Sequence, residues 1–533
     1  MSQEKRLLYP QGKEVTNEKP MNLKFFQDLK LDSVFYDSSN KRTGIPVMDF
    51  SQLFSTDPDV CEYRMDIIED MLNQPKIDEL FQKVLPEIEA IYELRKAKAD
   101  TEDIEVNLNA LKEIETYLKV IDLLSSYLLE MKPKSEGLQW FVERVKQIST
   151  SEEYEHLKTN SSDMVQQIGG MKSITLGVNL DTSNLTAKEI GVISVNSECF
   201  YSGDLIDRLL SARIKKDEYS CLTPLVSTKA AEGGASALFQ TVNHAITKIY
   251  KRAFQSFSSS VKQYLRCNTD FLIQMYEELL FYHKSYQLLE ELRAKGYPIC
   301  KAILAPKEEK AFHVLEEYNL VLALKFNQPV VRNSITFDEK GRFFLVTGPN
   351  HGGKSIFAAS IGMVQAMAQL GLYVPACSAR ISLVDNIFTH VPVEASEDIG
   401  KGRFGEECER LSNIMADITA DSMLIMDETL SSTSSAEGTY IAKEVLLSIV
   451  AIGCRGCFVT HMHELCNQVD EINQSPNHVI QIDHLVAQLE EGKEGKRSYR
   501  ILRTKPDGLS YARDIAKQYG LVYEVLMKNH GVK

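Results

Sequence analysis

The segment GPNHGGKS, residues 348–355, constrains the fold of this 533-residue chain more than any other feature. It fits the phosphate-binding loop pattern GxxxxGK[ST], in which glycines let backbone N–H groups curl around the phosphates of a nucleotide. The apolar run FFLVT precedes it and SIFAASIGMVQAMAQL follows it, so we expect a strand, the loop and a helix whose N-terminus favours an anion. The candidate nucleotide-binding residues of the loop are Gly348, Pro349, Asn350, His351, Gly352, Gly353, Lys354 and Ser355.

Within this loop, Lys354 is expected to reach the β- and γ-phosphates, and Ser355 to ligate Mg²⁺. A second apolar run, MLIM at 423–426, predicts a buried strand that ends in Asp427 and Glu428. Asp427 is the other candidate Mg²⁺ ligand, and Glu428 is the candidate for orienting the attacking water. A third run, FVT at 458–460, ends in His461, which we expect beside the two acids and in contact with the γ-phosphate. The alternative for such a histidine, taken alone, is an ordinary structural role. These residues predict an enzyme that uses ATP and Mg²⁺, with Glu428, His461 and Lys354 as its catalytic residues.

The first 330 residues are mainly helical in pattern, whereas the rest alternates short β-rich runs with helical segments. Pro75 and Pro86 are predicted to break or kink the first helical stretch. Alternating β-branched residues at 174–180 and 190–197 predict two short strands inserted in the helical part. The helical stretches are 59–98, 104–131 and 235–296. The last of them predicts one or two very long helices.

The composition is that of a soluble globular protein, with 44% apolar and 25% charged residues. The longest mainly apolar run, 445–457, is too short to span a membrane, and the N-terminus has no secretory pattern. Ten cysteines without framework spacing favour a reduced, cytoplasmic protein.

The net charge of −14 hides one basic window, residues 206–266, with 10 Lys and Arg against 4 Asp and Glu. Such a window is suited to the phosphate backbone of a nucleic acid, and the equally weighted alternative is a solvated helix face. The candidate nucleic-acid residues are Arg213, Lys215, Lys216, Lys248, Lys251 and Arg252.

Six segments, in order over residues 331–521, resemble the MutS family of DNA mismatch-repair ATPases. TGPNHGGKS resembles that family's phosphate loop TGPNMGGKS, with His351 in place of methionine. MDETLSSTSSAEG resembles DELGRGTSTxDG, and FVTHMHEL resembles FATHYHEL. The other three resemble the V-x-N segment that faces the adenine, the DRIFTRIG segment and the closing SYGIxVA; they lie at 331–337, 384–391 and 510–516. More weakly, residues 61–72 and the long helices resemble the family's core and lever region.

The resemblance implies an α/β C-terminal P-loop ATPase domain of the ABC type, preceded by a mainly α-helical core and lever domain with a small β insertion. It also implies a homodimer with composite ATP sites, in which Asn333 faces the adenine and Ser434 faces the γ-phosphate of the partner subunit. The domains expected on this basis are an N-terminal segment at 1–60, the helical domain at 61–300 with its β insertion near 173–197, and the ATPase domain at 301–533.

The chain departs from the family pattern in two places. Leu430, Ser431 and Ser432 replace Gly-Arg-Gly in the second motif. Mismatch readers of the family also carry a separate N-terminal domain with a Phe-x-Glu wedge, for which we find no room ahead of residue 61. Of the two Phe-x-Glu triplets in the chain, 141–143 lies in a helical pattern and 404–406 inside the ATPase part. We therefore expect no direct reading of mismatches.

Three functions remain open from the sequence. The first is a MutS-like ATPase that binds DNA and couples ATP binding and hydrolysis to a dimeric clamp in DNA repair or recombination control. The second is a nucleotide-gated factor that acts on ribosomes or structured RNA, because phosphate contacts are alike for both nucleic acids. The third is a degenerate ATPase with a structural role, against which the intact Lys354, Ser355, Asp427 and Glu428 argue.

A cluster of cysteines and histidines near residue 460 suggests zinc, but its spacing is incomplete for a zinc finger. The run at 457–460 also predicts a strand, which turns neighbouring side chains to opposite faces. We therefore favour a structural role for the cluster, which comprises Cys454, Cys457, His461, His463 and Cys466.

Overall fold

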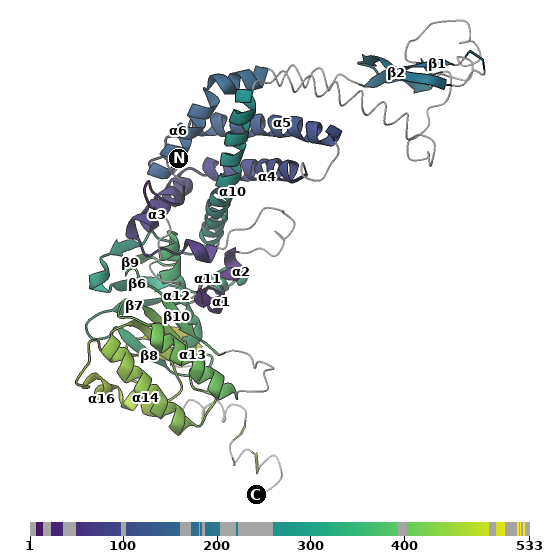
Figure 1. The fold of residues 1–533 in the computed structure, drawn as a ribbon. Helices are drawn as coiled ribbons and strands as arrows, with labels where there is room; N and C mark the ends of the chain where they lie inside the picture. Colours follow the sequence, from purple (N-terminus) through teal and green to yellow (C-terminus); the bar gives the residue numbers. More distant parts are fainter. Residues whose placement is uncertain are drawn as a thin grey trace.

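The molecule is elongated, with an α/β part at one end, a helical part beside it and a β-hairpin at the far end (Figure 1). A computed structural model provides the coordinates. The residues that it describes are 7–13, 23–35, 50–97, 103–159, 172–180, 182–183, 187–202, 220–221, 259–392, 402–489, 497–506, 520–521, 523 and 526–527.

The helical part begins with α3 (Pro58–Asn73), where the Asp57 side chain accepts a hydrogen bond from the backbone N–H of Asp59 and proline occupies the first turn. Pro75 separates α3 from α4 (Lys76–Ala97), as predicted. Pro86 lies inside α4, which continues past it. The other described helices of this part are α5 (Asp103–Leu128), α6 (Glu136–Ser149) and α10 (Ser259–Ala294).

Helix α10 has 36 residues, a length of about 54 Å at 1.5 Å per residue. It covers the second half of the stretch for which very long helices were predicted; residues 235–258 lie outside the described part. Arg95 of α4 ties three helices together, because its Nε donates to Oε1 of Glu113 on α5 at 2.8 Å and its guanidinium also contacts Thr269 and Asp270 on α10. Apolar side chains of α3, α4, α5, α6 and α10 form the core between them.

The β insertion is an antiparallel hairpin of β1 (Ser173–Leu180) and β2 (Ala187–Asn196), at the place where the sequence predicted two strands. Figure 1 shows it set apart from the helical bundle. Two short strands, β3 (Tyr201–Ser202) and β4 (Ser220–Cys221), pair in parallel.

The α/β part contains a six-stranded sheet with the order β10-β11-β12-β8-β13-β14, parallel except for β14. Side chains of its central strand β8 (Phe343–Thr347) alternate between two cores: Phe344 and Val346 belong to one, and Phe343 and Leu345 to the other. Burial on both faces explains the nearly continuous apolar runs in these strands. The remaining strands are β10 (Ile387–His390), β11 (Met423–Asp427), β12 (Arg455–Val459), β13 (Ile482–Leu489) and β14 (Arg497–Leu502).

Helices cover both faces of this sheet. The apolar side chains of α12 (Lys354–Leu370) join the core that continues into the helical part, and those of α13 and α14 join the other core. The bounds of the others are α13 (Arg403–Asp417), α14 (Ser435–Ile452), α15 (His463–Asn467) and α16 (Val469–Asn473).

A second, four-stranded sheet has the order β5-β9-β6-β7 and mixes parallel and antiparallel pairs. The structure is therefore mixed helix and sheet with both strand senses. This sheet and its neighbours comprise β5 (Ile303–Ala305), η4 (Lys307–Glu309), β6 (Phe312–Glu317), α11 (Leu320–Lys325), β7 (Asn333–Phe337) and β9 (Ser378–Ser382).

The described pieces of the first 60 residues pack between the helical and α/β parts. Arg64 of α3 is fully buried and donates to the carbonyl oxygens of Leu8, Leu53 and Leu370, so it joins this segment to the end of α12. The short helices of the segment are α1 (Lys24–Asp28), α2 (Asp32–Phe35) and η2 (Phe50–Leu53). In the described part of the chain, no helix is long and apolar enough to cross a bilayer.

Candidate functional site

The phosphate loop connects β8 to α12, as the sequence predicted. Its glycines meet two physical demands. Gly348 has φ 121° and a Cβ there would lie 2.9 Å from atoms of Ala487, while Gly353 caps α12 with φ 88°. Side-chain-bearing residues rarely adopt such angles, so both positions favour glycine.

Lys354 points back over the loop, with its Nζ donating to the carbonyl oxygens of Gly348 at 3.2 Å and Pro349 at 3.0 Å. Burial lowers the pKa of its ammonium group, and the negative charges of Glu428 and Asp427 oppose that shift. A buried ammonium group held by carbonyl dipoles is well placed to bind phosphate oxygens.

The two candidate Mg²⁺ ligands are in contact: the Ser355 hydroxyl donates to Oδ1 of Asp427 at 2.8 Å. Asp427 ends β11, the second strand from β8, so α12 and the strand end bring the pair together. Burial raises the pKa of the Asp427 carboxyl, while the hydrogen bond from Ser355 opposes the rise. A bound cation would favour the charged form, and hydroxyl and carboxylate oxygens are ligands that suit Mg²⁺.

Glu428 and His461 lie side by side, with Nε2 of the imidazole 2.8 Å from Oε1 of the carboxylate. They follow the ends of β11 and β12, which are neighbours in parallel, and the backbone N–H of Glu428 donates to the Val459 carbonyl at 2.9 Å. Both side chains are about two-fifths exposed, at 41% and 40%. Glu428 has φ 46°, a strained backbone conformation of the kind that clusters at functional sites.

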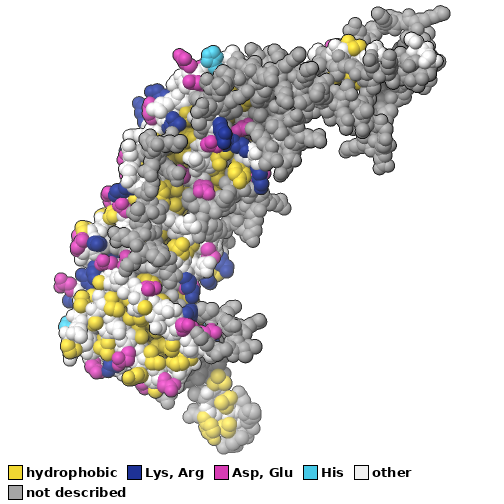
Figure 2. Space-filling view, in the orientation of Figure 1, with side chains coloured by type: hydrophobic (Ala, Val, Ile, Leu, Met, Phe, Trp, Pro, Cys, Tyr) yellow, Lys and Arg dark blue, Asp and Glu magenta, His cyan; other side chains and the backbone are white. Residues whose placement is uncertain are grey.

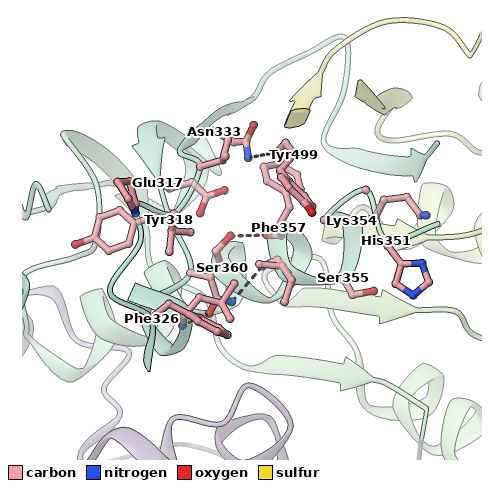
Figure 3. A pocket seen from close by; sticks show the side chains of 18 of the residues that line it. Glu317, Tyr318, Phe326, Asn333, His351, Lys354, Ser355, Phe357, Ser360 and Tyr499 are labelled. Atoms are coloured by element: carbon pink, nitrogen blue, oxygen red, sulfur yellow. Dashed lines mark hydrogen bonds between the residues drawn. The ribbon is translucent and has the colours of Figure 1, made fainter. Parts of the chain in front are cut away.

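Most of these residues line one cavity of about 620 Å³ that also receives side chains from β6, β7, α11 and β14; Gly348, Pro349 and Asp427 are not part of its lining. Figure 3 shows Glu317 and Asn333 on one side of this pocket and His351 and Ser355 on the other, with Tyr499 between them. Its volume lies in the range of small-molecule binding pockets. It therefore brings together the predicted residues Asn333, Asn350, His351, Gly352, Gly353, Lys354, Ser355, Glu428 and His461.

The amide of Asn333 is occupied by the backbone of β14. Its Nδ2 donates to the Tyr499 carbonyl at 3.2 Å, and its Oδ1 accepts from the N–H of Ile501 at 2.8 Å. Asn333 thereby holds Tyr499, whose backbone has φ 57° and whose side chain is 49% exposed, against the pocket. An exposed aromatic ring at this place offers a stacking surface to a base.

Sequence reasoning missed Tyr499, Phe326 and Glu317, all of which line the pocket. Tyr499 and Phe326 carry no motif that would have distinguished them from other aromatic residues. Glu317 is 1% exposed, and among the described residues neither of its carboxylate oxygens has a hydrogen-bond partner. Burial raises the pKa of this carboxyl to about 8.

The altered second motif keeps the backbone conformation that glycine favours. Leu430 has φ 63° and buries its side chain almost completely. Ser434 caps α14, accepting from the N–H of Glu437 and donating to Oε2 of that residue at 2.8 Å. Ser434 is exposed and does not line the pocket of its own chain.

The cysteine and histidine cluster does not form a shared site. Cys454 and Cys457 are buried, and burial raises the pKa of both thiols, that of Cys454 to about 12. Over the described ranges, no three His, Cys, Asp or Glu side chains gather to hold a metal ion.

The candidate nucleic-acid residues Arg213, Lys215, Lys216, Lys248, Lys251 and Arg252 lie outside the described residues, as does the segment 510–516. Their roles stay predictions.

Two protein families match this sequence, and together they cover most of it. The family described as MutS domain V matches residues 344–531, and the family described as MutS2 N-terminal domain matches residues 56–295. The first contains the phosphate loop and both strand-end motifs, and the second contains α3 to α10.

Several curated proteins are similar to this chain. One named "DNA mismatch repair protein MutS" from Chlorobium phaeovibrioides is 32% identical over 44% of this chain and 26% of its own length. Another of that name from Ruminiclostridium cellulolyticum is 36% identical over 37% of this chain and 22% of its own. "DNA mismatch repair protein MSH2" from Saccharomyces cerevisiae is 30% identical over 42% and 23%, respectively. The alignments thus span about a quarter of the length of these relatives.

Proposed function

Because this chain belongs to the MutS family, we propose that it is an ATP hydrolase of the MutS and ABC class that acts on DNA. One observation carries the proposal: two contacts meet at the phosphate loop. Ser355 of the loop contacts Asp427, and Glu428, the next residue, contacts His461. This set supplies a phosphate cradle, oxygen ligands for Mg²⁺ and a carboxylate for water.

Each residue has a defined task in this proposal. Lys354 and the backbone N–H groups of the loop bind the β- and γ-phosphates. Ser355 and Asp427 hold Mg²⁺, which when bound neutralises charge on the phosphate oxygens. Glu428 accepts a hydrogen bond from the attacking water and orients it, and His461 fixes the Glu428 carboxylate by its own hydrogen bond. Tyr499 packs against the base.

We propose that two copies form composite ATP sites. Ser434 is exposed at the N-terminus of α14, where the helix field favours an anion, and it lies outside the pocket of its own chain. Figure 2 shows apolar side chains gathered on the visible face of the α/β part, over the region of α14. Tyr440 on α14 is 67% exposed, in keeping with a surface that a second copy covers.

DNA is the proposed partner because the relatives are named as DNA mismatch repair proteins. Nucleotide binding would open and close a clamp formed by the helical arms of two copies. We propose that this chain does not read mismatches itself. Phe141 of the first Phe-x-Glu triplet is fully buried in the core on α6, and Phe404 of the second lies on α13 in the ATPase part. A ring packed in the core is not available to stack on a base.

The test is the ATP turnover rate with matched duplex, mismatched duplex, branched DNA, single-stranded DNA and ribosomes. We expect duplex or branched DNA to raise the rate and Lys354→Ala to abolish turnover under every condition. If only ribosomes raised the turnover rate, the alternative of a nucleotide-gated factor that acts on ribosomes or structured RNA would be favoured instead.

A further inference from the structure

The loop at residues 429–432 follows directly on Glu428 and leads to Ser434 at the start of α14. Its backbone is under strain, because Glu428 and Leu430 both have positive φ, 46° and 63°. Residues with side chains hold such angles only where the surrounding structure imposes them. Because Glu428 directly precedes this loop, contacts that hold the loop also restrain the backbone from which the Glu428 side chain extends.

Glu407 on α13 accepts hydrogen bonds from the loop at two points. Its Oε1 accepts from the backbone N–H of Leu430 at 2.6 Å, and its Oε2 accepts from the hydroxyl of Ser432. The side chain is only 8% exposed, so water competes little for these hydrogen bonds. A carboxylate that accepts two hydrogen bonds in a buried setting binds its donors more firmly than a neutral group does.

His390 on β10 contacts both the loop and Glu407. Its Nε2 lies 3.2 Å from the backbone carbonyl of Glu407, and its Nδ1 lies 2.9 Å from the hydroxyl of Thr429. A carbonyl only accepts, so Nε2 carries the hydrogen in the neutral ring and Nδ1 is the acceptor that faces the Thr429 hydroxyl. The same hydroxyl also lies 3.4 Å from the His390 carbonyl oxygen. Burial and the nearby charge of Arg410 lower the pKa of His390, which favours this neutral form.

The loop is also packed against α14. A Cβ on Gly438 would lie 2.9 Å from the Leu430 carbonyl oxygen, so the loop backbone and the first turn of α14 are in close contact. The Leu430 side chain is 1% exposed and belongs to the core shared by α13 and α14. A shift of α13 would therefore move the loop with it.

We propose that Glu407 is a positioning residue for ATP hydrolysis, acting through the loop 429–432 on Glu428 before it and Ser434 after it. The inference rests on the ATPase function proposed above. Glu407 is not among the residues that line the nucleotide pocket, so its contacts with the loop are separate from the contacts proposed for ATP. Its role is to fix the carboxylate that orients water, and displacement of that carboxylate by about 1 Å can lower a rate by about 100-fold.

The experiment compares three substitutions in the full chain. Glu407→Met keeps the length of the side chain and removes both acceptors. Glu407→Asp keeps the charge but shortens the reach, and Glu407→Gln keeps an acceptor for the Leu430 N–H. Glu409→Met places the same new side chain on the exposed face of α13 and serves as the matched control. For each protein, the Kd of ATP, kcat and the helix content by circular dichroism are measured.

We expect Glu407→Met and Glu407→Asp to lower kcat by about tenfold or more, with the Kd of ATP changed by less than about twofold. Glu407→Gln should retain most of the rate, and Glu409→Met should match the unmodified chain. If Glu407→Met fails to fold, Glu407→Asp decides. Unchanged kcat in the folded variants, or a loss of ATP affinity as large as the loss of rate, would overturn the inference. An unmodified chain that hydrolyses no ATP would instead refute the proposed function.

Discussion

Replacing Glu317 by glutamine should stabilise this protein, and the gain should grow as the pH rises. Glu317 lies on β6, paired across the sheet with Asn333, and is almost fully buried. The hydroxyl of nearby Ser360 donates to the Phe357 carbonyl at 2.7 Å, so its hydrogen is not available to the carboxylate. Burial therefore dominates and raises the pKa of the carboxyl from 4.5 to about 8.

Whether stability rises or falls with pH depends on which state of the chain, folded or unfolded, binds the proton. Between pH 4.5 and 8 the folded chain keeps Glu317 protonated, whereas the unfolded chain releases the proton. The free energy of unfolding then falls by about 1.4 kcal/mol for each pH unit in this window, which amounts to about 3 kcal/mol at pH 7. Stability associated with this group is complete below pH 4.5 and is lost as the pH rises towards 8. Glutamine does not titrate, so Glu317→Gln removes the loss while keeping the shape.

Urea unfolding at pH 5.5, 6.5 and 7.5 measures the effect, with Glu308→Gln on the exposed turn η4 as the control. The difference between Glu317→Gln and the unmodified chain should be small at pH 5.5 and largest at pH 7.5. The control should show no such trend. A difference that is the same at all three values of pH would refute the assignment of a buried, protonated carboxyl.

Three further predictions concern the nucleotide and DNA. Lys354→Ala should weaken ATP binding by about 1.5–3 kcal/mol, the value of a charge-assisted hydrogen bond, and this is measured as the Kd of a fluorescent ATP analogue; wild-type affinity would contradict the assigned role in phosphate binding. A competition assay should show less than a tenfold preference, about 1.4 kcal/mol, for a single mismatch over matched duplex, because Phe141 is buried; a larger preference means that another group reads mismatches. Changing Lys215, Lys216, Lys251 and Arg252 to Glu should weaken DNA binding for all sequences. The slope of log K against log salt concentration should become less steep by about 0.9 for each phosphate that the chain no longer neutralises. Unchanged binding, or weaker binding together with a loss of helix content by circular dichroism, would favour the solvated helix face.

The parts of the site that could be predicted are those whose residues lie close together in the sequence or at the ends of recognisable strands. The phosphate loop needs its glycines, Lys354 and Ser355 within eight residues, so a short pattern is sufficient. Asp427, Glu428 and His461 were predictable because parallel strands end at the same edge of a sheet. The hairpin β1–β2 and the break at Pro75 also follow from local patterns.

The parts that escaped prediction depend on contacts between distant residues. Tyr499 reaches the pocket because Asn333, far away in sequence, holds β14 by two hydrogen bonds. Glu407 contacts a loop more than 20 residues later, and its neighbours in sequence give no sign of this. The pieces of the first 60 residues follow the same rule, since the N–H of Leu8 donates to Glu278 on α10. No local periodicity encodes such pairs.

The most direct test of the central proposal measures ATP binding and Mg²⁺-dependent ATP turnover side by side for the unmodified chain and for Glu428→Ala. The unmodified chain should hydrolyse ATP slowly in the absence of DNA. Glu428→Ala should bind ATP with nearly unchanged affinity, because the phosphate cradle of β8 and α12 is intact, but should lose turnover because no carboxylate orients the water. Hydrolysis by Glu428→Ala at the rate of the unmodified chain would contradict the proposed site.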